Sequence, residues 1–454
     1  MSPLSALDLF LLTLYAASLF LPMFRFMRRR ADRDEFFVAG RRVTLPAFVA
    51  SLVSTWYGGI LGVGEYTFRY GISNWIVFGV PYYIWAAVFA LFMARPAHER
   101  RHTSLPDLLH ERYGREAGVA GSFLLFITTV PAVYALELGL LLTFVFKISL
   151  TTAVLAGTLF TLAYVIYGGL RSVIDTDVIQ FVLMFAGFSI MLPVLYLRSG
   201  GWAFLVSHLP ADLLSWDGGV GLQSILVWYV IASATMIEPG FYQRCYAARS
   251  PTTARNGILL SIVFWSIFDF MTTFTGLYAR ALLPISTTPT MAYPELGTMV
   301  LPPLLCGLFF LGMLATIMST LHGYLFIAGE MLGRDILRMG DANRWQWRTR
   351  IGLLVSAALS AWLAIRSQSI VRLWHDLGSL ASAALLVPIV AGYWSAKPVS
   401  GRAVFASIVC SSVTTLVWLL SKEVTGHFLW GIEPVFPGLL VSAALYLLAS
   451  RGRP

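Results

Sequence analysis

The chain has 454 residues, of which 57% are hydrophobic and only 12% are charged, with a formal net charge of +9. Soluble domains carry about 25% charged residues, so this composition excludes an ordinary soluble protein. It predicts an all-α polytopic membrane protein whose main partner is the lipid bilayer. The three cysteines (Cys245, Cys306 and Cys410) form no spaced cluster, which argues against a disulfide framework or a structural zinc site.

Apolar runs long enough to cross a bilayer recur along the whole sequence. We expect about 13 transmembrane helices, over residues 4–24, 44–69, 72–94, 118–146, 149–168, 174–198, 221–242, 257–281, 298–332, 349–367, 373–394, 402–421 and 429–449. No linker separates them, so residues 1–454 are expected to form a single domain. The run 4–24 is too long for a signal-peptide core and lacks a cleavage site, so it is expected to be a retained helix.

Basic residues predict the orientation of these spans. Most of the 32 Lys and Arg residues fall in alternate connections, with the largest groups in 25–42, 95–115 and 334–350. Cytoplasmic connections carry this excess, so we expect the N-terminus outside, the C-terminus in the cytoplasm and the protein in the cell (inner or plasma) membrane. The same bias accounts for the positive net charge, so no nucleic-acid partner is expected.

Two of the expected spans carry residues that interrupt a helix. Gly58 and Gly59 lie in the centre of 44–69, and Glu238-Pro239-Gly240 lies near the end of 221–242. If 44–198 and 221–394 are two five-helix units, each break falls in the first helix of its unit, and the odd number of spans inverts the second unit. Paired breaks in two halves indicate the central site of a transporter. The alternative is that the glycines only permit close helix packing.

Polar side chains interrupt the apolar run from Leu314 to Gly329. Thr316, Ser319 and Thr320 are spaced i, i+3 and i+4, so they share one helical face and their oxygens can converge on one small cation. His322 follows within the same span. The alternative is that the hydroxyls bond back to carbonyls of their own helix.

Further polar residues fall within the spans. Glu137 lies in the middle of 118–146, and Thr235 and Glu238 lie beside the second break. Intramembrane carboxylates indicate a functional site by default, and an acidic pair in a cavity would favour a solute with an amine or several hydroxyls. Packing between helices is the alternative for each.

Several separated segments resemble the sodium:solute symporter family, which contains the proline, pantothenate, sialic acid and sugar cotransporters. They are Phe37-Val38-Ala39-Gly40-Arg41, Gly168-Gly169-Leu170-Arg171-Ser172-Val173 with Thr176-Asp177 and Gln180, Gln243-Arg244 with Ala247-Ala248, and Met318-Ser319-Thr320-Leu321. The resemblance runs from about residue 36 to 395. It implies a LeuT-like fold of 5+5 inverted repeats, with one extra helix before the repeats and two after them, at 402–450.

The resemblance also implies the function. It would make the chain a sodium-coupled secondary active symporter that imports a small polar organic solute by alternating access, with Na⁺ as the coupling ion, and not an enzyme. The carried-over sodium site would use the carbonyls of Ser54, Tyr57 and Thr316 and the hydroxyls of Ser319 and Thr320. Five neutral oxygens suit a weakly held monovalent ion, whereas Ca²⁺ would recruit carboxylates.

The sequence departs from the family at a second sodium site. Family members with that site carry serines where this chain has His322 and Gly323, while Asp177 is retained. We therefore expect His322 to face Asp177 and one sodium to be coupled per solute. The imidazole would replace the second cation, carry a proton, or be a structural histidine.

The candidates for contact with the solute lie at the two breaks and in the expected span 118–146. They are Trp56, Gly58, Gly59, Glu137, Thr235, Glu238 and Pro239. Trp56 stands where the proline carriers have a functional aspartate, and Ala234 where sugar carriers have a tyrosine, which argues against both solutes.

Other functions remain as alternatives. They are a proton-coupled symporter on the same scaffold, a solute sensor that binds without transporting, and a membrane enzyme that uses Asp175 and Asp177 as a metal motif. The loops are too short to hold a nucleotide-sugar site. We expect a monomer to be sufficient for transport.

Overall fold

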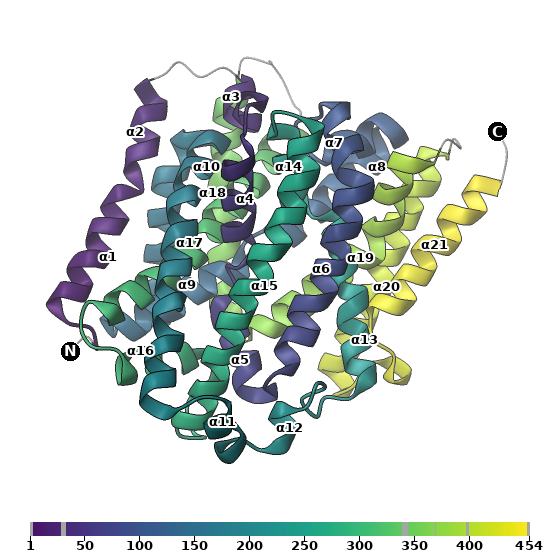
Figure 1. The fold of residues 1–454 in the computed structure, drawn as a ribbon. Helices are drawn as coiled ribbons and strands as arrows, with labels where there is room; N and C mark the ends of the chain where they lie inside the picture. The colour runs from purple at the N-terminus through teal and green to yellow at the C-terminus, as the bar shows by residue number, and fades with distance from the viewer. Residues whose placement is uncertain (1–2, 29–32, 338–343, 368, 396–398, 452–454) are drawn as a thin grey trace.

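The structure, a computed structural model, describes residues 3–28, 33–337, 344–367, 369–395 and 399–451, and these fold into a bundle of helices (Figure 1). The α-helices are α1 (Ala6–Ser18), α2 (Phe20–Arg28), α3 (Arg33–Val38), α4 (Leu45–Trp56), α5 (Ile60–Tyr70), α6 (Val80–Val88), α7 (Ala94–Arg100), α8 (Pro106–Thr129), α9 (Ala132–Phe146), α10 (Leu150–Ser199), α11 (Trp202–His208), α12 (Ala211–Leu214), α13 (Leu222–Ile231), α14 (Pro239–Ala247), α15 (Pro251–Leu282), α16 (Ala292–Val300), α17 (Leu305–Glu330), α18 (Trp345–Arg366), α19 (Ile370–Trp394), α20 (Gly401–Thr425) and α21 (Val435–Arg451). Short 3-10 or π-helical segments join several of them, such as η4 (Ala232–Ile237).

The all-helical fold class is confirmed, but the number of spans is not. Among the described residues, 10 helices are long and apolar enough to cross a membrane, or up to 11 if the bent pair α4 and α5 is one span. The expected first span, 4–24, corresponds to the apolar helix Ala6–Phe24, and the last to the shorter α21. The total of 13 spans remains a prediction.

Helix α10 explains part of this difference, because one element of 50 residues covers two expected spans. A straight helix of that length would measure about 75 Å, more than twice the thickness of a bilayer core of about 30 Å. Gly169 interrupts it with a φ of +62°. Tyr164, before the break, and Asp177, after it, both contact the ring of His322. On a straight helix they would lie about 20 Å apart, so α10 doubles back.

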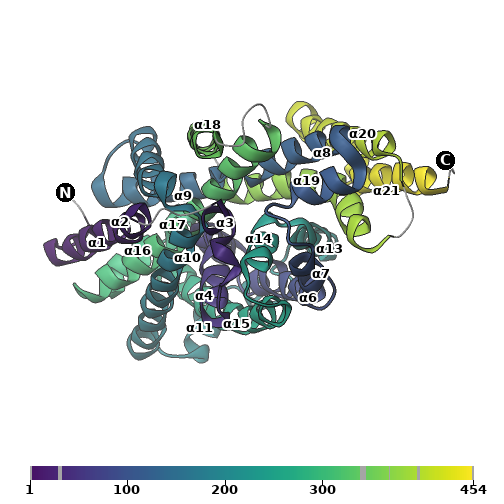
Figure 2. The same cartoon turned by 90° about the horizontal axis from the view of Figure 1, so that it is seen from above.

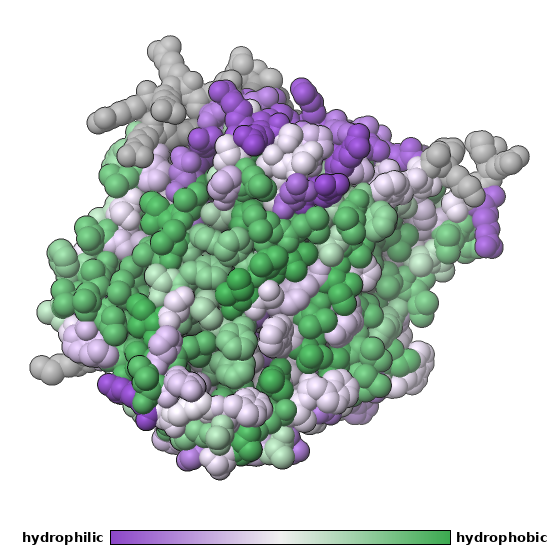
Figure 3. Space-filling view, viewed as in Figure 1, coloured by the Kyte–Doolittle hydropathy of each residue, from purple (hydrophilic) through white to green (hydrophobic). Residues whose placement is uncertain are grey.

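The basic connections gather on one face of the bundle. The turn from α7 to α8, the turn from α14 to α15 and helix α3 all lie at the top of Figure 1, and Figure 3 shows hydrophilic residues on this face above a broad apolar band. Helix α1 begins and α21 ends on opposite sides of the molecule (Figure 1). Residues 29–32 and 338–343, which also carry part of the basic bias, lie outside the described residues. Which face meets the cytoplasm remains a prediction.

Both predicted breaks are present. Helices α4 and α5 meet at an angle of 55°, and α13 passes through η4 before α14 begins at Pro239. Each break exposes backbone amides at the start of a helix, which need acceptors. The carboxylate of Glu137, on α9, accepts hydrogen bonds from the amides of Leu61 and Gly62 at 3.3 and 3.2 Å. Glu238 accepts one from the amide of Gly240 at 3.2 Å.

Helix α17 occupies the middle of the bundle. In the view from above, α4, α10 and α17 lie close together, with α1 and α21 at opposite ends of the molecule (Figure 2). The apolar window of α17 is 83% buried, whereas that of α20 is 28% buried. Helix α17, which carries the hydroxyl cluster, is therefore enclosed by other helices, whereas α20 largely faces outward.

Candidate functional site

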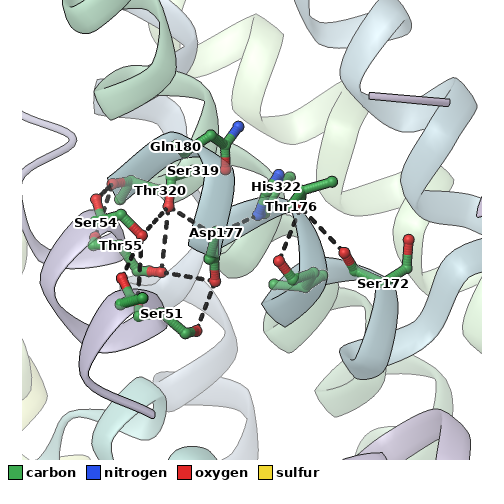
Figure 4. A network of polar contacts seen from close by, with 12 residues as sticks. Ser51, Ser54, Thr55, Ser172, Thr176, Asp177, Gln180, Ser319, Thr320 and His322 are labelled. Carbon is green, nitrogen blue, oxygen red and sulfur yellow. Dashed lines mark hydrogen bonds and ion pairs between the residues drawn. The ribbon is translucent and has the colours of Figure 1, made fainter. Parts of the chain in front are cut away.

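Three helices far apart in the sequence meet around the carboxylate of Asp177 (Figure 4). Asp177, on α10, is fully buried. Its Oδ2 accepts a hydrogen bond from Ser51 Oγ of α4 at 2.6 Å, and its Oδ1 accepts one from Ser319 Oγ of α17 at 2.7 Å. His322 Nε2 lies 2.9 Å from Oδ1. A carboxylate can remain charged inside a membrane protein only with such partners.

Beside Asp177, oxygen atoms of α4 and α17 form a compact group. Thr320 Oγ1 lies 2.7 Å from the carbonyl oxygen of Thr55 and 3.4 Å from that of Ser54. Ser319 Oγ lies 2.9 Å from Ser54 Oγ and 3.5 Å from Thr55 Oγ1. The structure thus brings Ser54, Ser319 and Thr320 together, and it adds Thr55, which the sequence analysis did not single out.

The other two residues of the carried-over sodium site, Thr316 and Tyr57, direct their hydroxyls to carbonyls outside the group. The hydroxyl of Thr316 donates to the carbonyl of Gly312 on its own helix at 2.6 Å, while the carbonyl of Thr316 lies 3.3 Å from Thr320 Oγ1. Thr316 therefore offers its carbonyl to the group, as expected. Tyr57 donates its hydroxyl to the carbonyl of Trp265 at 3.2 Å. The carbonyls of α4 that lie within 3.4 Å of Thr320 Oγ1 are those of Ser54 and Thr55.

Gly58 lies directly against Thr320. A Cβ atom at residue 58 would fall 2.2 Å from both Cβ and Oγ1 of Thr320. We therefore expect Gly58→Ala to displace Thr320 and to abolish sodium-dependent uptake, measured in proteoliposomes. Gly438→Ala is no suitable control, since its Cβ would also clash. In Gly221→Ala the new Cβ would meet no atom within 4 Å, and the substitution only strains a backbone with a φ of +82°. This variant is therefore the control for replacing a glycine without a steric clash. Uptake by Gly58→Ala equal to that by Gly221→Ala would contradict the packing role.

His322 is enclosed by two partners. Its Nε2 faces Asp177 Oδ1, and its Nδ1 lies 3.0 Å from the hydroxyl of Tyr164. Because Tyr164 and Asp177 lie on the two halves of α10, the imidazole ties both halves to α17. The ring is completely buried, so both of its nitrogens depend on these contacts.

The sequence analysis named Arg244 as part of a motif but did not place it at this site. Its guanidinium, on α14, is fully buried and donates to Thr55 Oγ1 at 2.9 Å and to Ser51 Oγ at 3.3 Å. It also lies 3.7 Å from Asp177 Oδ2. A buried charge needs a partner of opposite sign, and Asp177 supplies it. The Gln243-Arg244 pair was visible in the sequence as a motif, but its partner on α10 was not.

A cavity of about 200 Å³ lies between the two breaks. The first break contributes Trp56, Tyr57 and Gly59, and the second contributes Thr235, Glu238 and Pro239. Of the predicted solute contacts, Gly58 and Glu137 do not line this cavity, since Gly58 packs on Thr320 and Glu137 binds the amides that start α5. The cavity joins residues that are far apart in sequence, which the paired breaks predicted.

Comparisons with known proteins agree with this arrangement. The model of the sodium:solute symporter family matches residues 36–410. The sodium/pantothenate symporter of Haemophilus influenzae is 24% identical over 443 residues, covering 92% of this chain and 90% of the relative. The sodium/proline symporter of the same organism is 24% identical over 433 residues, covering 86% and 83%. A solved structure of a Na⁺-coupled sialic acid symporter in a substrate-bound outward-open state is similar in fold, with a TM-score of 0.83 at 16% identity, covering 98% of this chain and 97% of that one.

Proposed function

Because the chain belongs to the sodium:solute symporter family, we propose that its coupling sodium binds where α4 meets α17. The protein is a sodium-coupled symporter and not an enzyme. The proposed ligands are the carbonyls of Ser54, Thr55 and Thr316 and the hydroxyls of Ser319 and Thr320. The observation that carries this assignment is the approach of Thr320 Oγ1 on α17 to the carbonyl oxygens of Ser54 and Thr55 on α4, within 3.4 Å. The Thr316 carbonyl lies beside them through the i−4 contact of Thr320 within its own helix.

The chemistry of this oxygen group fits a transported monovalent ion. All five proposed ligands are neutral, so the ion is held weakly enough to be released in each cycle, whereas a divalent ion would require carboxylates. The Thr320 hydroxyl now donates to the Thr55 carbonyl. A bound cation would take the lone pairs of both oxygens, so this hydroxyl proton would rotate away from the carbonyl. The site thus exchanges an internal hydrogen bond for ion coordination.

Alternating access follows from placing this site between a broken helix and a continuous one. In our proposal, 44–198 and 221–394 are the two inverted five-helix units, and their first helices supply the two breaks beside the cavity. Sodium joins α4 to α17 and favours one orientation of the units, and the solute in the cavity favours the same orientation. Coupling needs only this shared preference.

We further propose that Arg244 and His322 together take the place of a second sodium at Asp177. Arg244 lies 3.7 Å and His322 lies 2.9 Å from the carboxylate oxygens of Asp177. A second Na⁺ would have to displace these tethered groups. One sodium per solute is therefore expected, with a Hill coefficient of about 1 for sodium activation. Uptake of solute and of ²²Na⁺ measured together would test this, and a ratio of two sodium ions per solute would contradict it.

The tethered histidine should not carry a proton through the cycle. We expect an imposed proton gradient, with K⁺ in place of Na⁺, to drive no uptake, because both nitrogens of His322 are held by Tyr164 and Asp177. Uptake driven by protons in the wild type and lost in His322→Gln would overturn this and would support the proton-coupled alternative.

The proposed setting is the inner or plasma membrane, with the N-terminus outside and the C-terminus in the cytoplasm, and with a monomer as the transporting unit. The gathering of basic connections on one face of the bundle supports this orientation. Labelling of single cysteines introduced before α1 and after α21 by a membrane-impermeant reagent tests it. Labelling of both sites from the same side would overturn it.

A further inference from the structure

The two helix ends that face the break region already have anionic partners. The start of a helix attracts negative charge through its free amides and its dipole. At α5, the amides of Leu61 and Gly62 are bound by Glu137, and at α14 the amide of Gly240 is bound by Glu238. A carboxylate of a solute would therefore compete with a carboxylate of the chain at either end.

The charged side chains that line the cavity are acidic. Among the described residues that line it, none is Lys, Arg or His, whereas Glu238 and Asp269 are both acidic. The buried guanidinium of Arg244 does not line the cavity. It contacts Ser51, Thr55 and Asp177, interacts electrostatically with Glu238, and its Nη1 makes no hydrogen bond with the described residues. Asp269 is engaged by the hydroxyl of Tyr83. Glu238 is a half-buried carboxylate at the wall, where it accepts a hydrogen bond from the Gly240 amide and also interacts with Tyr324 and Arg244.

Aromatic rings form the rest of the wall. Three pairs of neighbouring rings line the cavity, with centroids 5.5 Å apart in Trp56–Tyr82, 5.5 Å in Tyr134–Tyr324 and 5.7 Å in Phe78–Trp374. Glu238 interacts electrostatically with Tyr82, Tyr134 and Tyr324, so the carboxylate lies close to two of these pairs. Faces of Trp and Tyr attract cations through their π-electrons, most strongly where water is excluded.

We propose that this cavity recognises an organic ammonium group, with Glu238 as the counter-charge and Trp56, Tyr82 and Tyr134 as the surrounding rings. This inference rests on the proposed symport function and names the class of its solute. The cavity of about 200 Å³ is smaller than the 300–1,000 Å³ or so that is common for ligand pockets, so the solute is small. Solutes that carry a carboxylate, alone or beside an ammonium group, are disfavoured, because both helix ends are occupied and no basic side chain is among the described lining residues.

The test compares solutes that differ in charge but not in shape. Choline and its neutral carbon analogue 3,3-dimethyl-1-butanol serve as the matched pair, with pantothenate as an anion and proline as a zwitterion. Binding to the purified full chain is measured by thermal shift and calorimetry in Na⁺ and, separately, in K⁺. We expect choline to bind at least tenfold more tightly than each of the other three in Na⁺. Equal affinity for the matched pair, or tighter binding of pantothenate or proline, would overturn the proposal.

Variants of Glu238 and Tyr82 then test whether these residues bind the ammonium group. Glu238→Gln keeps an oxygen that accepts from the Gly240 amide, so α14 keeps its cap, but it removes the charge. We expect it to weaken choline binding at least tenfold and to leave the weak binding of the neutral analogue unchanged. Tyr82→Leu is expected to weaken choline binding similarly, whereas Tyr82→Phe, which keeps the ring, should stay within threefold of wild type. An unchanged choline affinity in Glu238→Gln, or an equal loss in Tyr82→Phe and Tyr82→Leu, would overturn the assignment.

The effect of sodium in the absence of solute distinguishes a failure of this proposal from a failure of the proposed symport function. Stabilisation of the ligand-free protein by Na⁺ relative to K⁺ reports the site between α4 and α17, and Glu238→Gln should retain it. Stabilisation by Na⁺ without a preference for choline would refute the ammonium cavity only. The absence of any effect of Na⁺ would refute the proposed sodium site, whichever solute binds.

Discussion

Sodium-driven uptake is expected to fall at least about a hundredfold when Ser319 and Thr320 are both replaced by alanine. Each hydroxyl supplies one proposed ligand, and a hydrogen bond or contact to a charged partner contributes about 1.5–3 kcal/mol. Two such losses weaken ion binding by about a hundredfold or more. Ser319→Ala/Thr320→Ala is measured by the sodium concentration that gives half-maximal uptake in proteoliposomes and by direct ²²Na⁺ binding.

Two matched substitutions control for this result. Thr316→Ala removes a hydroxyl that donates only to its own helix at Gly312 and leaves the proposed ligand, the carbonyl, in place. Ser356→Ala removes an equally buried hydroxyl that donates to Gly352 in α18. Both variants should bind sodium within about threefold of wild type. The sodium site would be refuted if the double variant bound ²²Na⁺ as the wild type does, or if Thr316→Ala were as damaging as the double variant.

The largest effect on stability is expected from Asp177→Asn. This change leaves the buried guanidinium of Arg244 without its counter-charge and takes an acceptor from Ser51, Ser319 and His322. Breaking a buried ion pair from one side costs about 3–5 kcal/mol. The melting temperature in detergent should fall markedly, and sodium should no longer raise it, because the hydroxyls around Asp177 lose their fixed positions.

Asp175→Asn is the matched control for Asp177→Asn. Asp175 is two positions earlier on α10, half exposed, and paired with Arg171 at 3.3 Å. Exposed pairs contribute at most about 1 kcal/mol, so this variant should melt near the wild type and transport normally. If Asp177→Asn and Asp175→Asn behaved alike, Asp177 would not be the charge that organises α4, α10, α14 and α17.

The fold could be predicted from the sequence to the extent that it depends on local pattern. Apolar runs predicted the helices. The glycines at 58–59 and Glu238-Pro239-Gly240 predicted both breaks, because Gly and Pro weaken a helix through their own backbone properties. The expected boundary between the spans 149–168 and 174–198 falls at Gly169, where α10 reverses. A Cβ at this residue would fall 2.9 Å from the carbonyl oxygen of Phe36, and the sequence could not reveal this contact because it depends on a distant segment.

The candidate site divides in the same way. The i, i+3, i+4 spacing placed Thr316, Ser319 and Thr320 on one face of a helix, but it did not reveal that Thr316 turns its hydroxyl to Gly312. Both Glu137 and Glu238 were expected to contact the solute. Only Glu238 reaches the cavity, because Glu137 is taken by the start of α5. Two buried glutamates look alike in a sequence and differ only in the amides that lie opposite them.

The sequence by itself determined that this chain spans a membrane, breaks two of its helices and carries a hydroxyl-rich segment, because helix formation and membrane insertion respond to neighbouring residues. Only the tertiary structure decided which charges meet. Arg244, Asp177 and His322 lie on three separate helices, and Glu137 and Glu238 are each assigned to a particular helix end. Electrostatic partners inside a membrane are chosen by distance in space, since an unpaired charge there is too costly to leave, and that distance is set by the packing of the whole bundle.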